Sequence, residues 1–132
     1  MIRLSRRFLI ALLVGAFALL GSSTASAASV TPTLIAGNPS CEGGLKIDPV
    51  VSGTYGAVTI VVTGKTFSFS TANGELVSDV IVKGGPNANW YHYDPPVISD
   101  TGLVAPTNKT GGLYGLSHLC FSVDDKKIPD PK

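Results

Sequence analysis

The chain has 132 residues, and its formal charge of +1 at pH 7 is unevenly distributed. All three arginines lie within residues 1–27, whereas residues 28–132 contain seven lysines against nine acidic residues, a formal charge of −2. This balance excludes most nucleic-acid-binding classes and argues against an anionic membrane surface as partner, because both need clusters of Arg and Lys. The length fits one domain and is too short for a TIM barrel or a two-domain Rossmann enzyme.

Residues 1–27 have the three parts of a secretory signal peptide. The positive segment Met1–Arg7 precedes the apolar run Phe8–Leu20, and a stretch of small residues ends in Ala25-Ser26-Ala27. As a helix the apolar run would span only about 20 Å, short of the ~30 Å that a transmembrane anchor needs. We therefore predict export and cleavage before Ala28, with the paired arginines leaving the twin-arginine route open beside the ordinary one.

Cys41 and Cys120 are the only cysteines. An even number of cysteines in an exported protein favours a disulfide, which here would join the start of the domain to its last strand. An intermolecular bridge and a catalytic thiol are the alternatives, although no C-x-x-C motif favours a redox role.

The remaining chain reads as a series of short strands. Residues 28–40 are expected to form a flexible lead-in, residues 41–124 the folded domain, and residues 125–132 a polar tail. Period-2 alternation of apolar residues predicts strands at Leu45–Ile47, Tyr55–Thr63, Thr66–Ser70, Leu76–Lys83, Asn89–Tyr93 and Gly115–Val123.

Turn signals separate these strands. Gly64-Lys65 predicts a hairpin with a type II′ turn, and Asn73-Gly74 predicts a second turn. Asp94-Pro95-Pro96 is expected to end its strand, and Asp100–Gly112 to form a long loop. No helical period occurs after Ala28, so we predict an all-β antiparallel sandwich of about six or seven short strands, stapled by one disulfide.

The densest aromatic cluster is Trp90–Tyr93. Alternation along a strand places Trp90 and His92 on one face and the two tyrosines on the other. If Trp90 and His92 are exposed, they form with Asn87 and Asn89 a candidate contact site for a sugar or a protein. The alternative is ordinary packing in the sandwich core.

His118 and Asp100 are further candidate binding residues, and with Asp94 they carry the alternative of a small hydrolase or a metal-stabilised module. Their spacing matches no metal-ligand motif, and Ser117 would point away from His118 on a strand, so no catalytic residue, metal ligand or cofactor is assigned. The glycine-rich run Lys83–Asn89 lacks the features of a phosphate loop and is interpreted as a connection.

Four motifs occur in order along the chain: VKGGPNAN at Val82–Asn89, YDP at Tyr93–Pro95, SDTGL at Ser99–Leu103 followed by Ala105-Pro106, and YGLSH at Tyr114–His118. Together they resemble an uncharacterised module of exported bacterial proteins, often of actinobacterial type, found alone or within larger surface proteins. The resemblance implies an extracellular β-rich domain and transfers no catalytic residue. The family often has its late cysteine two positions further on, where this chain has Ser122.

The sequence therefore predicts a secreted, non-catalytic β-sandwich module, structural or binding. The expected partner is an envelope glycan or an extracellular protein, without a cofactor and without nucleic acid.

Overall fold

The computed structural model describes residues 27–131. The predicted signal peptide therefore lies, apart from Ala27, outside the described residues. Within the described range the chain forms nine strands and no helix. This part of the chain therefore has no helix that is long and apolar enough to cross a membrane.

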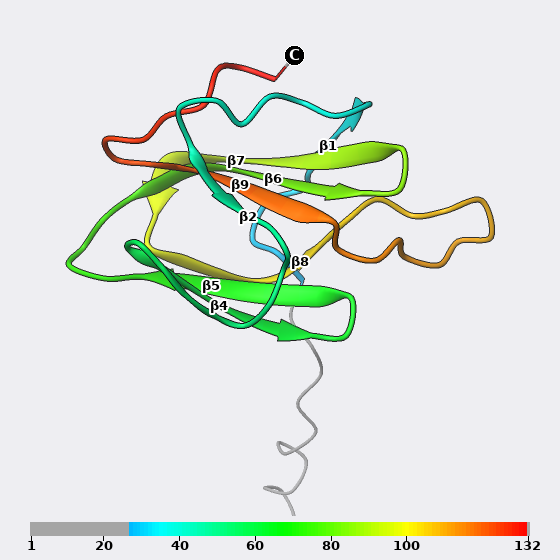
Figure 1. The fold of residues 1–132 in the computed structure, drawn as a ribbon, viewed down its shortest axis with the longest axis horizontal. Coiled ribbons are helices and arrows are strands. Elements are labelled where there is room, and N and C mark those ends of the chain that lie inside the picture. Colours follow the sequence, from blue (N-terminus) through cyan, green and yellow to red (C-terminus); the bar gives the residue numbers. More distant parts are fainter. Residues whose placement is uncertain (1–26, 132) are drawn as a thin grey trace, which may run out of the picture.

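The strands form two antiparallel sheets that lie face to face (Figure 1). The larger sheet has the order β1-β7-β6-β9-β2, with β1 at Thr33–Ala36, β7 at Asn87–Val97, β6 at Val77–Gly84, β9 at His118–Val123 and β2 at Leu45–Ile47. The smaller sheet has the order β3-β4-β5-β8, with β3 at Gly53–Tyr55, β4 at Val58–Thr63, β5 at Thr66–Thr71 and β8 at Ser99–Val104. The predicted all-β sandwich is confirmed, with nine strands where six or seven were expected.

Alternation along the central hairpin determines which side chains enter the core. On β4, Val58 and Ile60 are buried, and on β5 Phe67 and Phe69 are buried, while the residues between them face outward. Gly64 connects the two strands with a φ of +63°, and Lys65 keeps a negative φ, as the predicted type II′ turn requires.

The core between the sheets is built around three edge-to-face aromatic contacts. Phe121 of β9 meets Phe69 at 5.2 Å and Phe67 at 6.4 Å between ring centroids, and Phe69 meets Tyr93 of β7 at 6.1 Å. Such pairs stabilise the fold by roughly 0.5–1.5 kcal/mol each beyond the area they bury. These contacts fix how the two sheets sit against each other.

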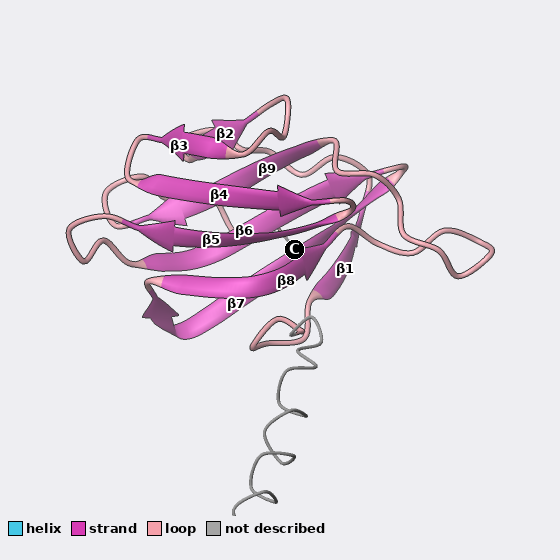
Figure 2. Cartoon of the chain, turned by 90° about the horizontal axis from the view of Figure 1, so that it is seen from below, coloured by secondary structure: helices cyan, strands magenta, loops and turns pink. Residues whose placement is uncertain are grey.

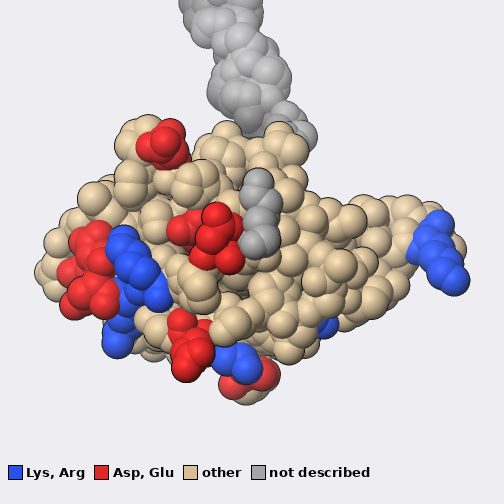
Figure 3. Space-filling model, turned by 90° about the horizontal axis from the view of Figure 1, so that it is seen from above, with Lys and Arg blue, Asp and Glu red and all other residues tan. Residues whose placement is uncertain are grey.

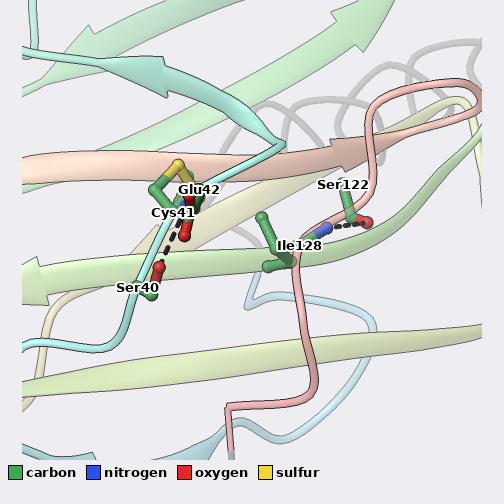
Figure 4. The surroundings of a disulfide bond; sticks show 6 residues. Ser40, Cys41, Glu42, Ser122 and Ile128 are labelled. Carbon is green, nitrogen blue, oxygen red and sulfur yellow. Dashed lines mark hydrogen bonds between the residues drawn. A yellow bond between two sulfur atoms is a disulfide. The ribbon is translucent and has the colours of Figure 1, made fainter.

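A second, smaller apolar cluster lies on the outer face of the five-stranded sheet. Its buried members are Ile81, Ala88, Trp90 and Cys120, and it is covered by Ile35, Cys41 and Ile128. The predicted disulfide joins Cys41 to Cys120 with a Cα–Cα distance of 5.6 Å. Beside it the Ile128 N–H donates to the Ser122 hydroxyl at 3.2 Å, which holds the C-terminal segment against the bridge (Figure 4).

The segments expected to flank the domain take part in it. Residues 28–40, expected to be a flexible lead-in, contain β1, which pairs with β7, and Ala28 and Val30 pack against the main core. Residues 125–132, expected to be a polar tail, contribute Ile128 and a bridge between Val123 and Lys126.

The predicted strand end at the proline pair was wrong. Asp94-Pro95-Pro96 does not end its strand, because β7 continues to Val97. Asp79 pairs with His92 and Val77 pairs with Val97, so the intervening residues of β7 bulge away from β6. Prolines are tolerated in this bulge because residues there do not need to donate a backbone N–H to the neighbouring strand.

The loop predicted at Asp100–Gly112 was also wrong in its first part, because β8 pairs with β5 over Ser99–Val104. The sequence of this strand has no clear apolar alternation, because Leu103 is its only fully buried apolar side chain. The predicted strand Tyr55–Thr63 is likewise divided, because a turn at Gly56-Ala57 separates β3 from β4.

Candidate functional site

Trp90 and His92 share the outer face of the five-stranded sheet, but they are not an open aromatic patch. Trp90 is only 9% exposed, because its ring belongs to the second apolar cluster. The ring of His92 lies 5.5 Å from that of Trp90 and is more than half exposed. Both rings bind one oxygen of Asp79: the indole N–H donates to it at 2.9 Å, and Nδ1 of His92 lies 2.7 Å from it.

Asp79 thus organises this cluster. Its other oxygen accepts a hydrogen bond from Ser78 at 2.8 Å. Burial by itself raises the pKa of Asp79, but the hydrogen bonds from His92, Trp90 and Ser78 together lower it below its ordinary value. The carboxylate holds the two rings in place, and this role is structural.

The structure separates the two asparagines from this cluster. Asn87 and Asn89 alternate with Trp90 along β7 and face the other side of the sheet. Asn89 is buried and donates to the Val104 carbonyl at 2.9 Å, and Asn87 accepts from the Gly37 N–H at 3.2 Å. Of the four residues expected to form one contact site, Trp90 and His92 therefore come together, while the two asparagines lie on the opposite face of the sheet.

His118 begins β9 and is 8% exposed. Within residues 27–131 its imidazole makes no hydrogen bond or ion pair. Burial lowers the pKa of His118, and the positive charge of Lys46 lowers it further. These surroundings disfavour the protonated imidazole, and no carboxylate among the described residues is hydrogen-bonded to it.

Asp100 lies in the other sheet, on β8, and is fully engaged there. It accepts from the Tyr93 hydroxyl at 2.8 Å, from the Ser29 hydroxyl at 3.1 Å and from the Ser29 N–H at 3.0 and 3.1 Å. Burial and this hydrogen bond to a carboxylate raise the pKa of Tyr93 well above its ordinary value. The structure thus places Asp100 with Tyr93 and Ser29 rather than with His118. Among the described residues no group of three or more His, Cys, Asp or Glu side chains is arranged to hold a metal ion.

A different surface, missed by the sequence reasoning, is the outer face of the four-stranded sheet (Figure 2). We call it the hydroxyl face. It comprises Thr54 of β3; Thr59, Val61 and Thr63 of β4; Thr66, Ser68 and Ser70 of β5; and Ser99 and Thr101 of β8. None of these side chains is buried, and eight of the nine carry a hydroxyl group.

The hydroxyl face has no ionisable side chain. The nearest lysine in sequence, Lys65, extends its ammonium group to the Leu113 carbonyl at 3.0 Å, and Asp100 turns inward to Tyr93. By contrast, Figure 3 shows acidic and basic side chains gathered on the side of the five-stranded sheet. The two outer faces of the sandwich therefore differ in chemistry: one is charged and partly covered, the other neutral and open.

Most of these hydroxyl groups are available to a ligand. Thr54 and Thr59 bond to each other at 2.8 Å, and Thr66 donates to the Thr63 carbonyl at 3.1 Å. The other five hydroxyl groups make no hydrogen bond to any residue between 27 and 131. Each can both donate and accept, as a sugar hydroxyl does.

A shallow hollow lies on the hydroxyl face, between β4, β5 and β8. Its volume is about 310 Å³, and its lining includes Val61, Thr63, Ser68 and Thr101. It forms at a β-bulge, where Phe67 pairs with Leu103 but Phe69 pairs with Asp100, so that two residues of β8 oppose one of β5. One of the two is Gly102, whose φ of +73° allows the bend.

Comparisons of the chain with protein-family models, with curated proteins and with solved structures give no match. Its function is therefore inferred from the geometry of its own residues.

Proposed function

We propose that this chain is a secreted, non-catalytic β-sandwich module that binds a neutral extracellular polysaccharide across its hydroxyl face. The observation that carries the proposal is an open sheet face with eight hydroxyl side chains and no charge. Charged residues make up 14% of the chain, and none of them lies on this face, whose chemistry is that of neutral hydroxyl and methyl groups.

The chemistry of the face fits a neutral sugar polymer. Ser and Thr hydroxyls exchange hydrogen bonds with sugar hydroxyls, and the methyl groups of threonine and of Val61, which is 55% exposed, can contact the apolar C–H faces of sugar rings. Nucleic acid, anionic lipid or an acidic glycan would instead require lysine or arginine on the face. The hollow is large enough to hold one or a few sugar residues.

Three features support secretion. The disulfide is typical of oxidising compartments outside the cytoplasm. Residues 1–27 have the sequence of a signal peptide. The four motifs between Val82 and His118 resemble those of an exported bacterial module.

The proposal is tested by affinity electrophoresis of the processed protein in gels containing dextran, mannan or a soluble β-glucan, with polygalacturonate as the anionic comparison. We expect retardation by at least one neutral polymer. Because no charge takes part, retardation should be the same at 20 mM and 500 mM NaCl.

Two charged substitutions in the hollow locate the site. Thr101→Lys and Thr63→Lys each place a bulky ammonium group on the hydroxyl face and should weaken binding at least tenfold. The matched control is Thr33→Lys on β1, also exposed but in the other sheet, which should bind as wild type. Absence of binding to every neutral polymer, or equal binding by Thr101→Lys and wild type, would overturn the proposal.

A further inference from the structure

Asp100 holds the segment at which the predicted signal peptide ends. Its two carboxylate oxygens both accept from the Ser29 N–H, and one of them also accepts from the Ser29 hydroxyl. Ala28 and Val30, on either side of Ser29, pack against the main core. The described chain is thus already seated in the sandwich at Ala28.

Further hydrogen bonds from β7 and β8 hold the Asp100 carboxylate in place. Tyr93 donates to Asp100 at 2.8 Å from the buried core, and the Thr101 N–H donates at 2.9 Å from β8. No lysine takes part in these contacts. These hydrogen bonds therefore hold a negatively charged carboxylate close to the start of the predicted mature chain.

We propose that Asp100 stabilises, by electrostatic attraction through space, the N-terminal ammonium group that cleavage before Ala28 creates. Hydrolysis of the Ala27–Ala28 peptide bond adds the elements of water: the carbonyl of Ala27 becomes a carboxylate, and the nitrogen of Ala28 becomes an amine that is protonated at neutral pH. Adjacent backbone nitrogens lie about 3.5 Å apart, so this ammonium group forms within about 7 Å of the Asp100 carboxylate.

Processing then changes the energetics of the fold. In the precursor the Ala28 nitrogen is a neutral amide, and in the processed chain it carries a positive charge beside a negative one. The titratable groups at this segment are Asp100, which accepts from Ser29, Tyr93, which donates to Asp100, and Tyr91, which lines a hollow together with Ala28. Burial raises the pKa of both phenols, so they stay neutral in the range where the amine titrates.

The experiment first determines the start of the exported protein by mass spectrometry, and we expect Ala28. The processed chain is then assembled by native chemical ligation at Cys41, from a synthetic peptide of residues 28–40 with either a free or an acetylated Ala28. Urea unfolding at pH 6.5 should give an unfolding equilibrium constant about two- to fivefold larger for the acetylated chain, the range of a partly exposed ion pair.

Asp100→Asn is the matched variant, because its side-chain oxygen still accepts from Ser29 and Tyr93 while its charge is gone. In this background acetylation should change the unfolding constant by less than 1.5-fold. The wild-type effect should also vanish at pH 10: pairing raises the amine's pKa above its unfolded value of about 8, so the stabilisation is complete below pH 8 and is lost as the amine deprotonates.

The pH comparison needs no variant, so it decides the matter even if Asp100→Asn fails to fold. A first residue other than Ala28, or an acetylation effect that is equal at pH 6.5 and pH 10, overturns the proposal. Neither result bears on polysaccharide binding, because the hydroxyl face lies on the outside of the sheet and Asp100 faces inward.

Discussion

His118 is a buried histidine whose surroundings oppose its protonation. Burial lowers its pKa, Lys46 and Lys83 lower it further, and the more favourable charge of Asp48 only partly compensates. The unfolded chain takes up a proton at this histidine as the pH falls below about 6.5, whereas the folded chain takes it up only at a lower pH. The contribution of His118 to stability is therefore full above pH 6.5 and is lost as the pH falls toward its folded pKa.

We predict that His118→Gln reduces the loss of stability between pH 7.5 and pH 5. Glutamine does not titrate, so the variant should keep more of its free energy of unfolding over this interval than wild type. Urea unfolding followed by tryptophan fluorescence at the two pH values measures the difference. Parallel pH profiles for the two proteins would show that His118 is protonated equally well in both states.

At the scale of elements, the chain packs closely on itself at the end of β6. A Cβ atom added at Gly84 would lie 2.5 Å from the Cβ of Ala105 and 2.5 Å from the carbonyl oxygen of Gly115. Both neighbours are short or part of the backbone, so neither can move aside. The glycine-rich motif at this point is thus required for packing, which agrees with its interpretation as a connection.

Gly84→Ala is expected to destabilise the fold by about 1–3 kcal/mol, the usual cost of overpacking. Gly115→Ala is the matched control, because a Cβ there meets nothing within 4 Å and the residue has no positive φ. Its effect should stay within about 0.5 kcal/mol. The measurement is the urea midpoint of each variant; equal midpoints for the two variants would contradict the close packing at Gly84.

Strands with clear alternation were predictable from the sequence, and those defined by their partners were not. The alternating Phe67 and Phe69 predict β5, and the β-branched run Val80-Ile81-Val82 predicts β6, which lies between β7 and β9. Edge strands β1 and β8 have weak patterns of their own, because each needs only one neighbour and buries few side chains. Their existence depends on pairing with β7 and β5, which local sequence does not encode.

The candidate site was less predictable for a related reason. The outward Ser and Thr residues of β4 and β5 are visible in the sequence, but the same pattern describes any solvent-exposed strand face. Only the three-dimensional structure shows that β8 extends this face, that Asp100 turns away from it and that no segment of residues 27–131 lies over it (Figure 2). Conversely, the aromatic cluster looked like a site because a strand pattern cannot show that Ile128 and the disulfide cover Trp90.

For the whole molecule, the disulfide is the strongest single constraint on the unfolded chain. Cys41 and Cys120 are separated by 79 positions, so the bridge closes a loop that contains β2 to β8, seven of the nine described strands, and the start of β9. We predict that replacing both cysteines with alanine lowers the free energy of unfolding by about 2–4 kcal/mol. The loss is measured by urea unfolding of the double variant.

The reduced wild-type protein is the control for this pair of substitutions. Wild type unfolded in the presence of a reductant should match the double variant, since both lack the same restriction on the unfolded chain. A double variant as stable as the oxidised wild type would show that the bridge adds nothing to the fold.

The position of the bridge also determines how the molecule carries mechanical load. A pull applied at residues 27 and 131 runs along the chain to Cys41, crosses the sulfur–sulfur bond to Cys120 and leaves through the last residues. The strands from β2 to β8 sit in a closed covalent loop that bears no tension, so they cannot be drawn out one after another. Only β1 and the end of β9 with its following segment can extend, and a module tethered at both ends would keep its hydroxyl face intact under strain.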